Sequence, residues 1–219
     1  MHGLGRTPND TVIGNVMVLN GDYDFTGGAL ANFWRSAENF KFRPNGGPMI
    51  WAVSQACPLR RAVIEGDLNL FNYNPPSPGA GYASGGFMAD IKVMGTVTSG
   101  SQQQFISRNV EMEKWETGVW NMVFVGSKGA PQSHCGNQGG AGPYTTVDAT
   151  PIIAEKAYIV ADGNSYKLMK PKVEKNKVGN TPGWVNADEI DFSDVYVANE
   201  NDTAATINAK LEEGLHLVL

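Results

Sequence analysis

The hydrophobic positions of the chain recur in short alternating runs. Each run follows one pattern, in which Asn or Asp precedes an apolar residue, any residue and a second apolar residue. The pattern begins at Asn15, Asn39, Asp67, Asp90 and Asn109, at intervals of 19 to 28 residues. Alternation with a period of two predicts a strand that buries one face. Because one such strand cannot bury its face alone, the repeat predicts stacked copies of a strand unit.

The period favours an all-β fold, a right-handed parallel β-helix of the pectate-lyase-like type. Leucine-rich repeats need a leucine consensus that the chain lacks, and helical repeats carry a 3.6-residue period. The Asn or Asp of each unit is expected at a corner, because short polar side chains tolerate left-handed backbone. A β-sandwich with fortuitous spacing is the alternative. Trp34 and Trp51 lie within repeat units and are expected in the core.

The character of the sequence changes after Pro143. We expect β-helix coils over 1–143, an inter-domain β-hairpin or linker over 144–200, and the start of a second β-helix over 201–219. Alternating runs at 152–160 and 166–169 flank Asp162-Gly163, which is a hairpin signal. The lysines of 167–177 predict a solvated, protected hairpin edge.

The last twenty residues predict a helix followed by a strand. Residues 202–211 form the expected helix, with Asp202 or Thr203 as the N-cap and Gly214 as the stop. The strand is expected over 215–219. Because the chain ends inside this strand, we expect it to be part of something longer.

Composition narrows the classes of function. Apolar residues make up 42% of the chain and charged residues 18%, while 26 Gly and 12 Pro predict many turns. A net charge of −5 without a basic block argues against a nucleic-acid partner, and no apolar run is long enough for a membrane partner. Neither the two cysteines, Cys57 and Cys135, nor His134 beside Cys135 gives metal-ligand spacing, so we expect no metal and no cofactor.

Several long motifs resemble the glycoside hydrolase family 55 group of exo-β-1,3-glucanases. They lie at 2–8, 14–18, 28–39, 51–61, 101–109, 120–126, 143–151 and 202–208. The resemblance implies an extracellular protein with two β-helix domains side by side, of which this chain is an internal fragment. It also implies β-1,3-glucan of the laminarin type as the substrate and inverting removal of glucose from its chain ends. In that chemistry an acid protonates the leaving oxygen while a water attacks from the opposite face.

The resemblance assigns roles to a few residues. The general-acid glutamate is expected outside this chain, beyond Leu219. Gln103 and Ser127 are expected to position the attacking water, since an amide and a hydroxyl can both hydrogen-bond it. Gln102 and Gln104 are expected to contact the substrate.

Other residues are assigned from their own chemistry. The indoles of Trp115 and Trp120 are candidate platforms for sugar rings, although tryptophan is also a common core residue. Glu111 and Glu113 alternate with apolar neighbours, which predicts solvated carboxylates rather than a catalytic pair.

Two readings of the whole chain stay open beside the glucanase. The first is a non-catalytic β-helix that is structural, self-assembling or carbohydrate-binding, with self-association or a partner chain that completes the second β-helix. The second is a polysaccharide lyase, for which the chain lacks an acidic cluster with calcium-loop spacing.

Overall fold

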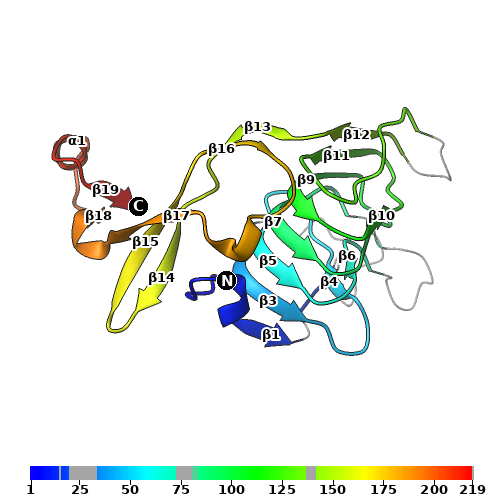
Figure 1. The fold of residues 1–219 in the computed structure, drawn as a ribbon, viewed down its shortest axis with the longest axis horizontal. Helices are drawn as coiled ribbons and strands as arrows, with labels where there is room; N and C mark the ends of the chain where they lie inside the picture. Colours follow the sequence, from blue (N-terminus) through cyan, green and yellow to red (C-terminus); the bar gives the residue numbers. More distant parts are fainter. Residues whose placement is uncertain (15, 20–33, 73–80, 82, 137–141, 219) are drawn as a thin grey trace. The chain divides into compact units, whose positions relative to one another are not determined.

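The computed structural model describes residues 1–14, 16–19, 34–72, 81, 83–136 and 142–218. These residues form two compact units (Figure 1). The larger unit comprises Met1–Ile153 and Glu174–Val185, and the smaller comprises Ala154–Val173 and Asn186–Leu219. Asn15 of the predicted repeat and most of the motif at 28–39 lie outside the described residues. The expected division into 1–143, 144–200 and 201–219 stays a prediction.

The larger unit contains two parallel sheets, which the chain visits alternately from β1 to β11 (Figure 1). One sheet has seven strands in the order β1-β3-β5-β7-β9-β11-β12, and the other has five in the order β10-β8-β6-β4-β2. The expected all-β class and parallel stacking are therefore confirmed. The strands of the first sheet are β1 (Val12–Gly14), β3 (Ala37–Arg43), β5 (Pro58–Ile64), β7 (Phe87–Val93), β9 (Gln104–Glu111), β11 (Asn121–Val125) and β12 (Tyr144–Val147). Those of the second are β2 (Met17–Val18), β4 (Met49–Trp51), β6 (Leu68–Asn69), β8 (Thr96–Thr98) and β10 (Lys114–Glu116).

Two shorter features complete the larger unit. Strands β13 (Thr150–Ile153) and β16 (Glu174–Lys177) form an antiparallel pair. The 3₁₀ helices are η1 (Pro8–Asp10) and η2 (Pro182–Trp184).

The core of this unit is built from aligned rows of buried side chains. The five-stranded sheet contributes a row in which each member is paired in register with the next: Met49, Leu68, Val97 and Trp115. The seven-stranded sheet contributes Ala37, Leu59, Met88, Ser107 and Phe124 in the same way. Each fully buried aliphatic side chain contributes about 1.5–3 kcal/mol to stability. Trp51 is 1% exposed and confirms the expectation, but Trp34 is 85% exposed, so its assignment to the core is wrong.

A row of left-handed residues bends the strands of the seven-stranded sheet at one level. Asn39, Arg61, Asp90, Asn109 and Gly126 have φ values between 44° and 63°. The paired residues on either side of them place the five next to one another on successive strands. We call this row the αL ladder. Three of its members were predicted from the repeat, since Asn and Asp tolerate this backbone conformation.

The side chains of the αL ladder bind the segment 177–184. One Asp90 carboxylate oxygen accepts hydrogen bonds from the backbone N–H of Thr181 at 2.6 Å and from its hydroxyl at 2.8 Å. The Asn109 amide donates to the carbonyl of Lys177 at 3.0 Å. Arg61 donates to the carbonyl of Trp184 at 2.9 Å. The ladder thereby binds residues that lie far away in the sequence.

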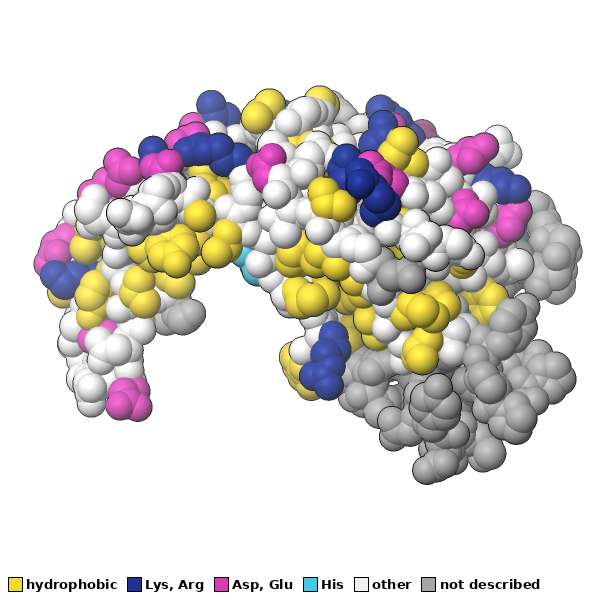
Figure 2. Space-filling view, turned by 90° about the horizontal axis from the view of Figure 1, so that it is seen from below, with side chains coloured by type: hydrophobic (Ala, Val, Ile, Leu, Met, Phe, Trp, Pro, Cys, Tyr) yellow, Lys and Arg dark blue, Asp and Glu magenta, His cyan; other side chains and the backbone are white. Residues whose placement is uncertain are grey.

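Lys177 is buried, which corrects the expectation of a wholly solvated lysine stretch. Its side chain is 3% exposed, and its ammonium lies 3.4 Å from Asp90, 2.7 Å from Glu174 and 2.7 Å from the Thr181 hydroxyl. A buried charge needs such partners, since desolvation alone is costly. Lys167 and Lys172 do pair with acidic residues of the smaller unit. The space-filling view shows basic and acidic side chains beside one another on that unit (Figure 2).

Asp67 does not belong to the αL ladder, although its motif matches the repeat. It directly precedes β6 of the other sheet, and its carboxylate accepts a hydrogen bond from the N–H of Thr96 at 2.8 Å. The motif thus predicts a strand correctly here, but the strand belongs to the five-stranded sheet and Asp67 is not part of the αL ladder.

The smaller unit contains an antiparallel sheet, one helix and a parallel strand pair. The sheet has the order β14-β15-β17, and β14 and β15 form the predicted hairpin, with Gly163 at a φ of 61°. The run expected at 152–160 is divided between β13 and β14, which belong to different units. The elements are β14 (Tyr158–Asp162), β15 (Ser165–Pro171), β17 (Ala187–Asp191), η3 (Phe192–Asp194), β18 (Val195–Val197), α1 (Ala204–Glu212) and β19 (His216–Val218).

The helix of the smaller unit agrees with the sequence. The Thr203 hydroxyl accepts a hydrogen bond from the N–H of Thr206, which confirms it as the N-cap, and Gly214 follows with a φ of 85°. Strand β19 pairs in parallel with β18. Within the part of the chain that the structure describes, no helix has the length and apolarity that a membrane span requires.

Loss of the Asp90 carboxylate is expected to destabilise the larger unit. Asp90→Ala removes one of the two carboxylates beside the buried Lys177 ammonium and both bonds from Thr181, so the free energy of unfolding should fall by about 3 kcal/mol. Urea denaturation followed by tryptophan fluorescence measures this change. Glu116→Ala is the matched control, because Glu116 forms an exposed pair with Lys114 and should cost less than about 1 kcal/mol. Equal effects of the two substitutions would contradict the role of the ladder.

Glu65 predicts an acid-sensitive contribution to stability. Hydrogen bonds from Arg43 at 2.6 Å and Lys41 at 2.9 Å lower the pKa of the Glu65 carboxyl from 4.5 to about 2. A lowered pKa stabilises the fold above the unfolded value, and this contribution disappears as the pH falls from about 4.5 to about 2. The stability difference between wild type and Glu65→Gln should therefore shrink over that range in urea denaturation. A difference that stays constant from pH 6 to pH 2 would rule out this ion pair as its source.

Candidate functional site: a polar cavity beside the αL ladder

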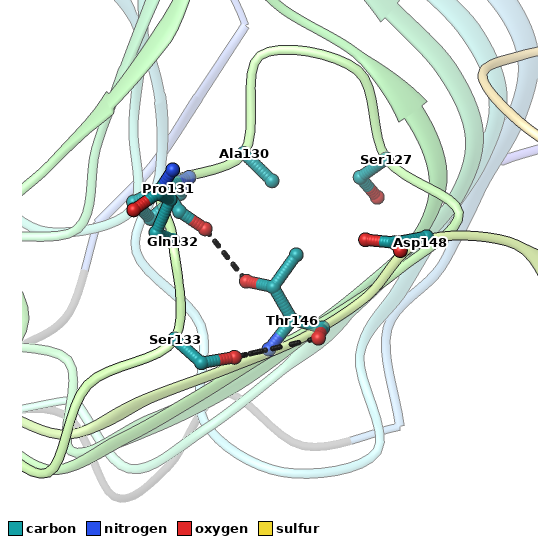
Figure 3. Close-up of a pocket in the computed structure, with 7 residues that line it drawn as sticks. All are labelled: Ser127, Ala130, Pro131, Gln132, Ser133, Thr146 and Asp148. Atoms are coloured by element: carbon teal, nitrogen blue, oxygen red, sulfur yellow. Dashed lines mark hydrogen bonds between the residues drawn. The ribbon is translucent and has the colours of Figure 1, made fainter.

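A polar cavity lies where the chain leaves β11 and β12. Its volume is about 300 Å³. Figure 3 shows the side chains around it. It is lined by Ser127, Ala130, Pro131, Gln132, Ser133, Thr146 and Asp148. Hydroxyls, one amide and one carboxylate give this cavity hydrogen-bonding partners of the kind that a sugar hydroxyl needs.

Gly126 of the αL ladder sets the position of Ser127. A Cβ atom at residue 126 would lie 2.4 Å from the carbonyl oxygen of Lys177 and 2.9 Å from the Asn109 amide, so only glycine fits. The chain turns at this point and delivers Ser127 to the cavity. The Ser127 oxygen lies 3.2 Å from the carbonyl of Ser107 and 3.4 Å from the N–H of Val110. A hydroxyl has two acceptor lone pairs, so one remains for a ligand.

Asp148 supplies the carboxylate of the cavity. It follows β12 and is exposed. Its side chain lies at the same end of the cavity as Ser127 (Figure 3). Asp148 could not be found from residue spacing, because no second carboxylate or histidine stands near it in the chain.

The opposite end of the cavity is held by its own hydrogen bonds. The Ser133 hydroxyl accepts from the N–H of Thr146 at 2.8 Å, and the Thr146 hydroxyl donates to the carbonyl of Pro131 at 2.7 Å (Figure 3). These bonds fix the loop after Ser127 against β12. The cavity is therefore formed before any ligand arrives, as small-molecule sites usually are.

The structure does not bring Gln103 and Ser127 together. Gln103 precedes β9, and the register pairs Gln104 with Asn121 at the beginning of β11. Ser127 follows the end of β11 and lies beside Val110. Nearly the whole of β9 separates them, which corresponds to roughly 15–20 Å. One water molecule cannot contact both side chains across this distance, so the geometry does not support their joint assignment to it.

Gln102 has its hydrogen bonds inside the fold. Its side chain is fully buried. The carbonyl oxygen accepts from the N–H of Gly85 at 2.8 Å, and the amide nitrogen donates to the carbonyls of Val53 and Leu70 at 2.9 Å. Gln104 is half-buried at the beginning of β9.

The two candidate indoles differ in accessibility. Trp115 is 7% exposed, its ring packs edge-on against Phe124 at 4.9 Å between centroids, and its N–H donates to the carbonyl of Thr117. Trp120 is 53% exposed. In this structure Trp120, and not Trp115, has an indole face that a ligand can reach.

The remaining candidates do not form an acid–base pair. Hydrogen bonds from Lys92 and Lys128 hold the pKa of Glu111 below its usual range, so this carboxylate is a poor proton donor. Glu113 is exposed, and Val110 and Met112 are buried as expected. His134 accepts a hydrogen bond from the N–H of Gly136, and neither Cys57 nor Cys135 forms a disulfide bond. The residues that the structure describes contain no group of three His, Cys, Asp or Glu that could hold a metal ion.

Replacement of Gln102 tests whether this residue is structural. Gln102→Ala should lower the free energy of unfolding by roughly 2–4 kcal/mol, because it leaves three buried backbone groups without a partner. Gln103→Ala, at a half-buried position, should change it by less than about 1 kcal/mol. Urea denaturation checks both values. If Gln102→Ala unfolded like wild type and instead lost affinity for glucan, the substrate-contacting role would be supported.

Comparisons with known proteins show what the chain is similar to. No protein-family model matches it. It is 42% identical over 219 residues to an exo-beta-1,3-glucanase of Streptomyces sp. (strain SirexAA-E / ActE), covering 99% of this chain and 34% of that relative. The chain therefore spans about a third of the length of this relative.

Two solved structures match the whole chain. One is sacteLam55A from Streptomyces sp. SirexAA-E, with a TM-score of 0.86 and 41% identity, covering 100% of this chain and 38% of that one. The other is a single-residue variant of sacteLam55A in complex with glucose, with a TM-score of 0.85 and 40% identity over the same shares.

Proposed function

We propose, because the chain resembles glycoside hydrolase family 55 along its entire length, that it serves the hydrolysis of β-1,3-glucan. The observation that carries this proposal is 42% identity over 219 residues to an exo-beta-1,3-glucanase, together with a TM-score of 0.86 to a solved structure. The match of a glucose complex to the whole chain also supports a glucan substrate.

The proposed reaction is inverting and acts on chain ends. Inversion requires an acid for the leaving oxygen and a second group that directs water to the opposite face of the ring. Among the described residues that line the polar cavity, Asp148 is the single carboxylate. The family resemblance implies that the general-acid glutamate lies outside this chain, and we keep that placement as part of the proposal. Ser127 is the group of this chain that we expect to hold the water. Gln103, at the other end of β9, lies too far from Ser127 to contact the same water molecule.

The proposed architecture is a right-handed β-helix that continues into a second one. Parallel strands joined by a crossover within one sheet are right-handed in about 98% of cases, and the seven-stranded sheet is built from such crossovers. An extracellular location is proposed from the glucanase relative.

A non-catalytic, glucan-binding β-helix is the second candidate. It is favoured by the single carboxylate of the polar cavity, because the pair that acid–base hydrolysis needs is not present among the described lining residues. The two candidates agree that the chain binds β-1,3-glucan. They differ on whether a longer polypeptide that contains it releases glucose.

Binding and hydrolysis can be tested separately. We expect the 219-residue chain to be retarded by laminarin in affinity electrophoresis and to release no glucose, because the proposed proton donor lies outside this chain. A polypeptide that carries this chain within the full length of the glucanase relative should release glucose from laminarin. Hydroxyethyl cellulose, a β-1,4-glucan, is the control polymer.

Each failure has a distinct meaning. Equal retardation by both polymers, or by neither, would contradict the β-1,3-glucan substrate. Robust glucose release by the mass-verified 219-residue chain would contradict the external acid. Laminarin binding without any release by the longer polypeptide would favour the non-catalytic candidate.

A further inference from the structure

Trp34 is highly exposed and adopts an unfavourable backbone conformation. Neither packing nor backbone preference explains its position. Its 85% exposure is the largest among the big hydrophobic residues that the structure describes. Its φ is 56°, in the left-handed region that is unfavourable for a bulky side chain. An exposed aromatic residue held in a strained conformation suggests a role outside the fold itself.

A cavity of about 340 Å³ adjoins this indole. It is lined by Trp34, Arg35, Ser36, Ala56 and Pro58. Small-molecule sites begin at about 300 Å³, so the volume suits one or two sugar rings. Ala56 also has a φ of 56°, so two residues of the cavity carry left-handed backbone on separate turns of the chain. The cavity combines an apolar ring face with the fork of donors of a guanidinium group.

An apolar row leads from the cavity across the outer face of the seven-stranded sheet. Pro58 is in register with Phe87, which is in register with Ile106, which is in register with Val123. Adjacent strands are about 4.8 Å apart, so the row extends about 14 Å. Ile106 is 40% exposed and the other three are partly exposed.

Basic groups accompany this row. The guanidinium carbons of Arg60 and Arg108 lie 4.7 Å and 5.4 Å from the ring centroid of Phe87. In the space-filling view, hydrophobic side chains of the larger unit are exposed with basic side chains beside them (Figure 2).

We propose that Trp34 and Arg35 form a binding subsite for β-1,3-glucan. The indole stacks on the apolar face of a glucose ring, Arg35 donates to its hydroxyls, and the row from Pro58 to Val123 supports the following glucose units. This assignment rests on the proposed function. A glucose ring has an apolar face and a polar rim, which matches the cavity, whereas a stable protein partner would need roughly 800 Å² on this side.

The strain at Trp34 provides a test that separates binding from folding. Glycine adopts a φ of 56° without penalty, so Trp34→Gly should unfold at a higher urea concentration than wild type while binding laminarihexaose roughly tenfold more weakly. Trp34→Phe keeps an aromatic face and should stay within about threefold of wild type in affinity. Ile152→Ala is the control, because Ile152 is 64% exposed in the same unit and does not line the cavity of Trp34. Isothermal titration calorimetry measures the affinities.

Oxidation of tryptophan by N-bromosuccinimide gives an independent readout in the unmodified chain. Trp34 and Trp120 are exposed, while Trp51, Trp115 and Trp184 are buried. Laminarihexaose should protect Trp34 from oxidation, as mapped by peptide mass spectrometry. Protection of Trp120 alone, or unchanged affinity of Trp34→Gly, would overturn the subsite and leave the proposed function intact. Absence of binding by the wild type would overturn both.

Discussion

The larger unit depends on a row of residues that must all adopt left-handed backbone at one level of a parallel sheet. Asn39, Arg61, Asp90 and Asn109 occupy four of these positions, and Gly126 occupies the fifth. Their side chains project from the bends and need partners, because buried polar groups without hydrogen bonds are costly. Many of these partners are backbone groups of chain segments outside the two parallel sheets, so the bends and the covering segments stabilise each other.

The same row positions both surfaces that could contact a ligand. At its end, Gly126 allows the close approach of the Lys177 carbonyl and directs Ser127 into the polar cavity. Along the strands before the bends, the outer face bears the apolar row that begins at the cavity of Trp34. The polar cavity offers hydroxyls and a carboxylate, and the Trp34 cavity offers a ring face and a guanidinium group. Hydrogen bonding and stacking are thus separated on the two surfaces.

Local signals were predictable from the sequence, whereas partners distant in the chain were not. Asn39, Asp90 and Asn109 predicted the bends, and Asp162-Gly163 predicted the hairpin. These features were predictable because a bend or a tight turn depends on the conformation of one or two residues. Arg61 was missed because arginine has no preference for left-handed backbone. Its place in the row follows only from its position beside Asn39, to whose side-chain oxygen it donates a hydrogen bond. Lys177 was misassigned because a lysine becomes buried only when Asp90, 87 residues away, supplies the counter-charge. Trp34 was assigned to the core because an aromatic residue within a repeat normally is buried.

The large sequence separation between the αL ladder and its partners also determines the order in which the larger unit can fold during synthesis. Thr181, the partner of Asp90, follows it by 91 residues in the chain, and Trp184, the partner of Arg61, follows it by 123. On a ribosome that adds about 5–20 residues per second, Asp90 is synthesised roughly 5–18 s before its partner. In that interval the carboxylate stays hydrated at the surface of an unfinished stack. Folding of such long-range contacts is slow, since the entropy of loop closure is lost before they form. The segment 177–184 therefore binds the αL ladder late in synthesis, so the larger unit is completed from its N-terminal end towards its C-terminal end.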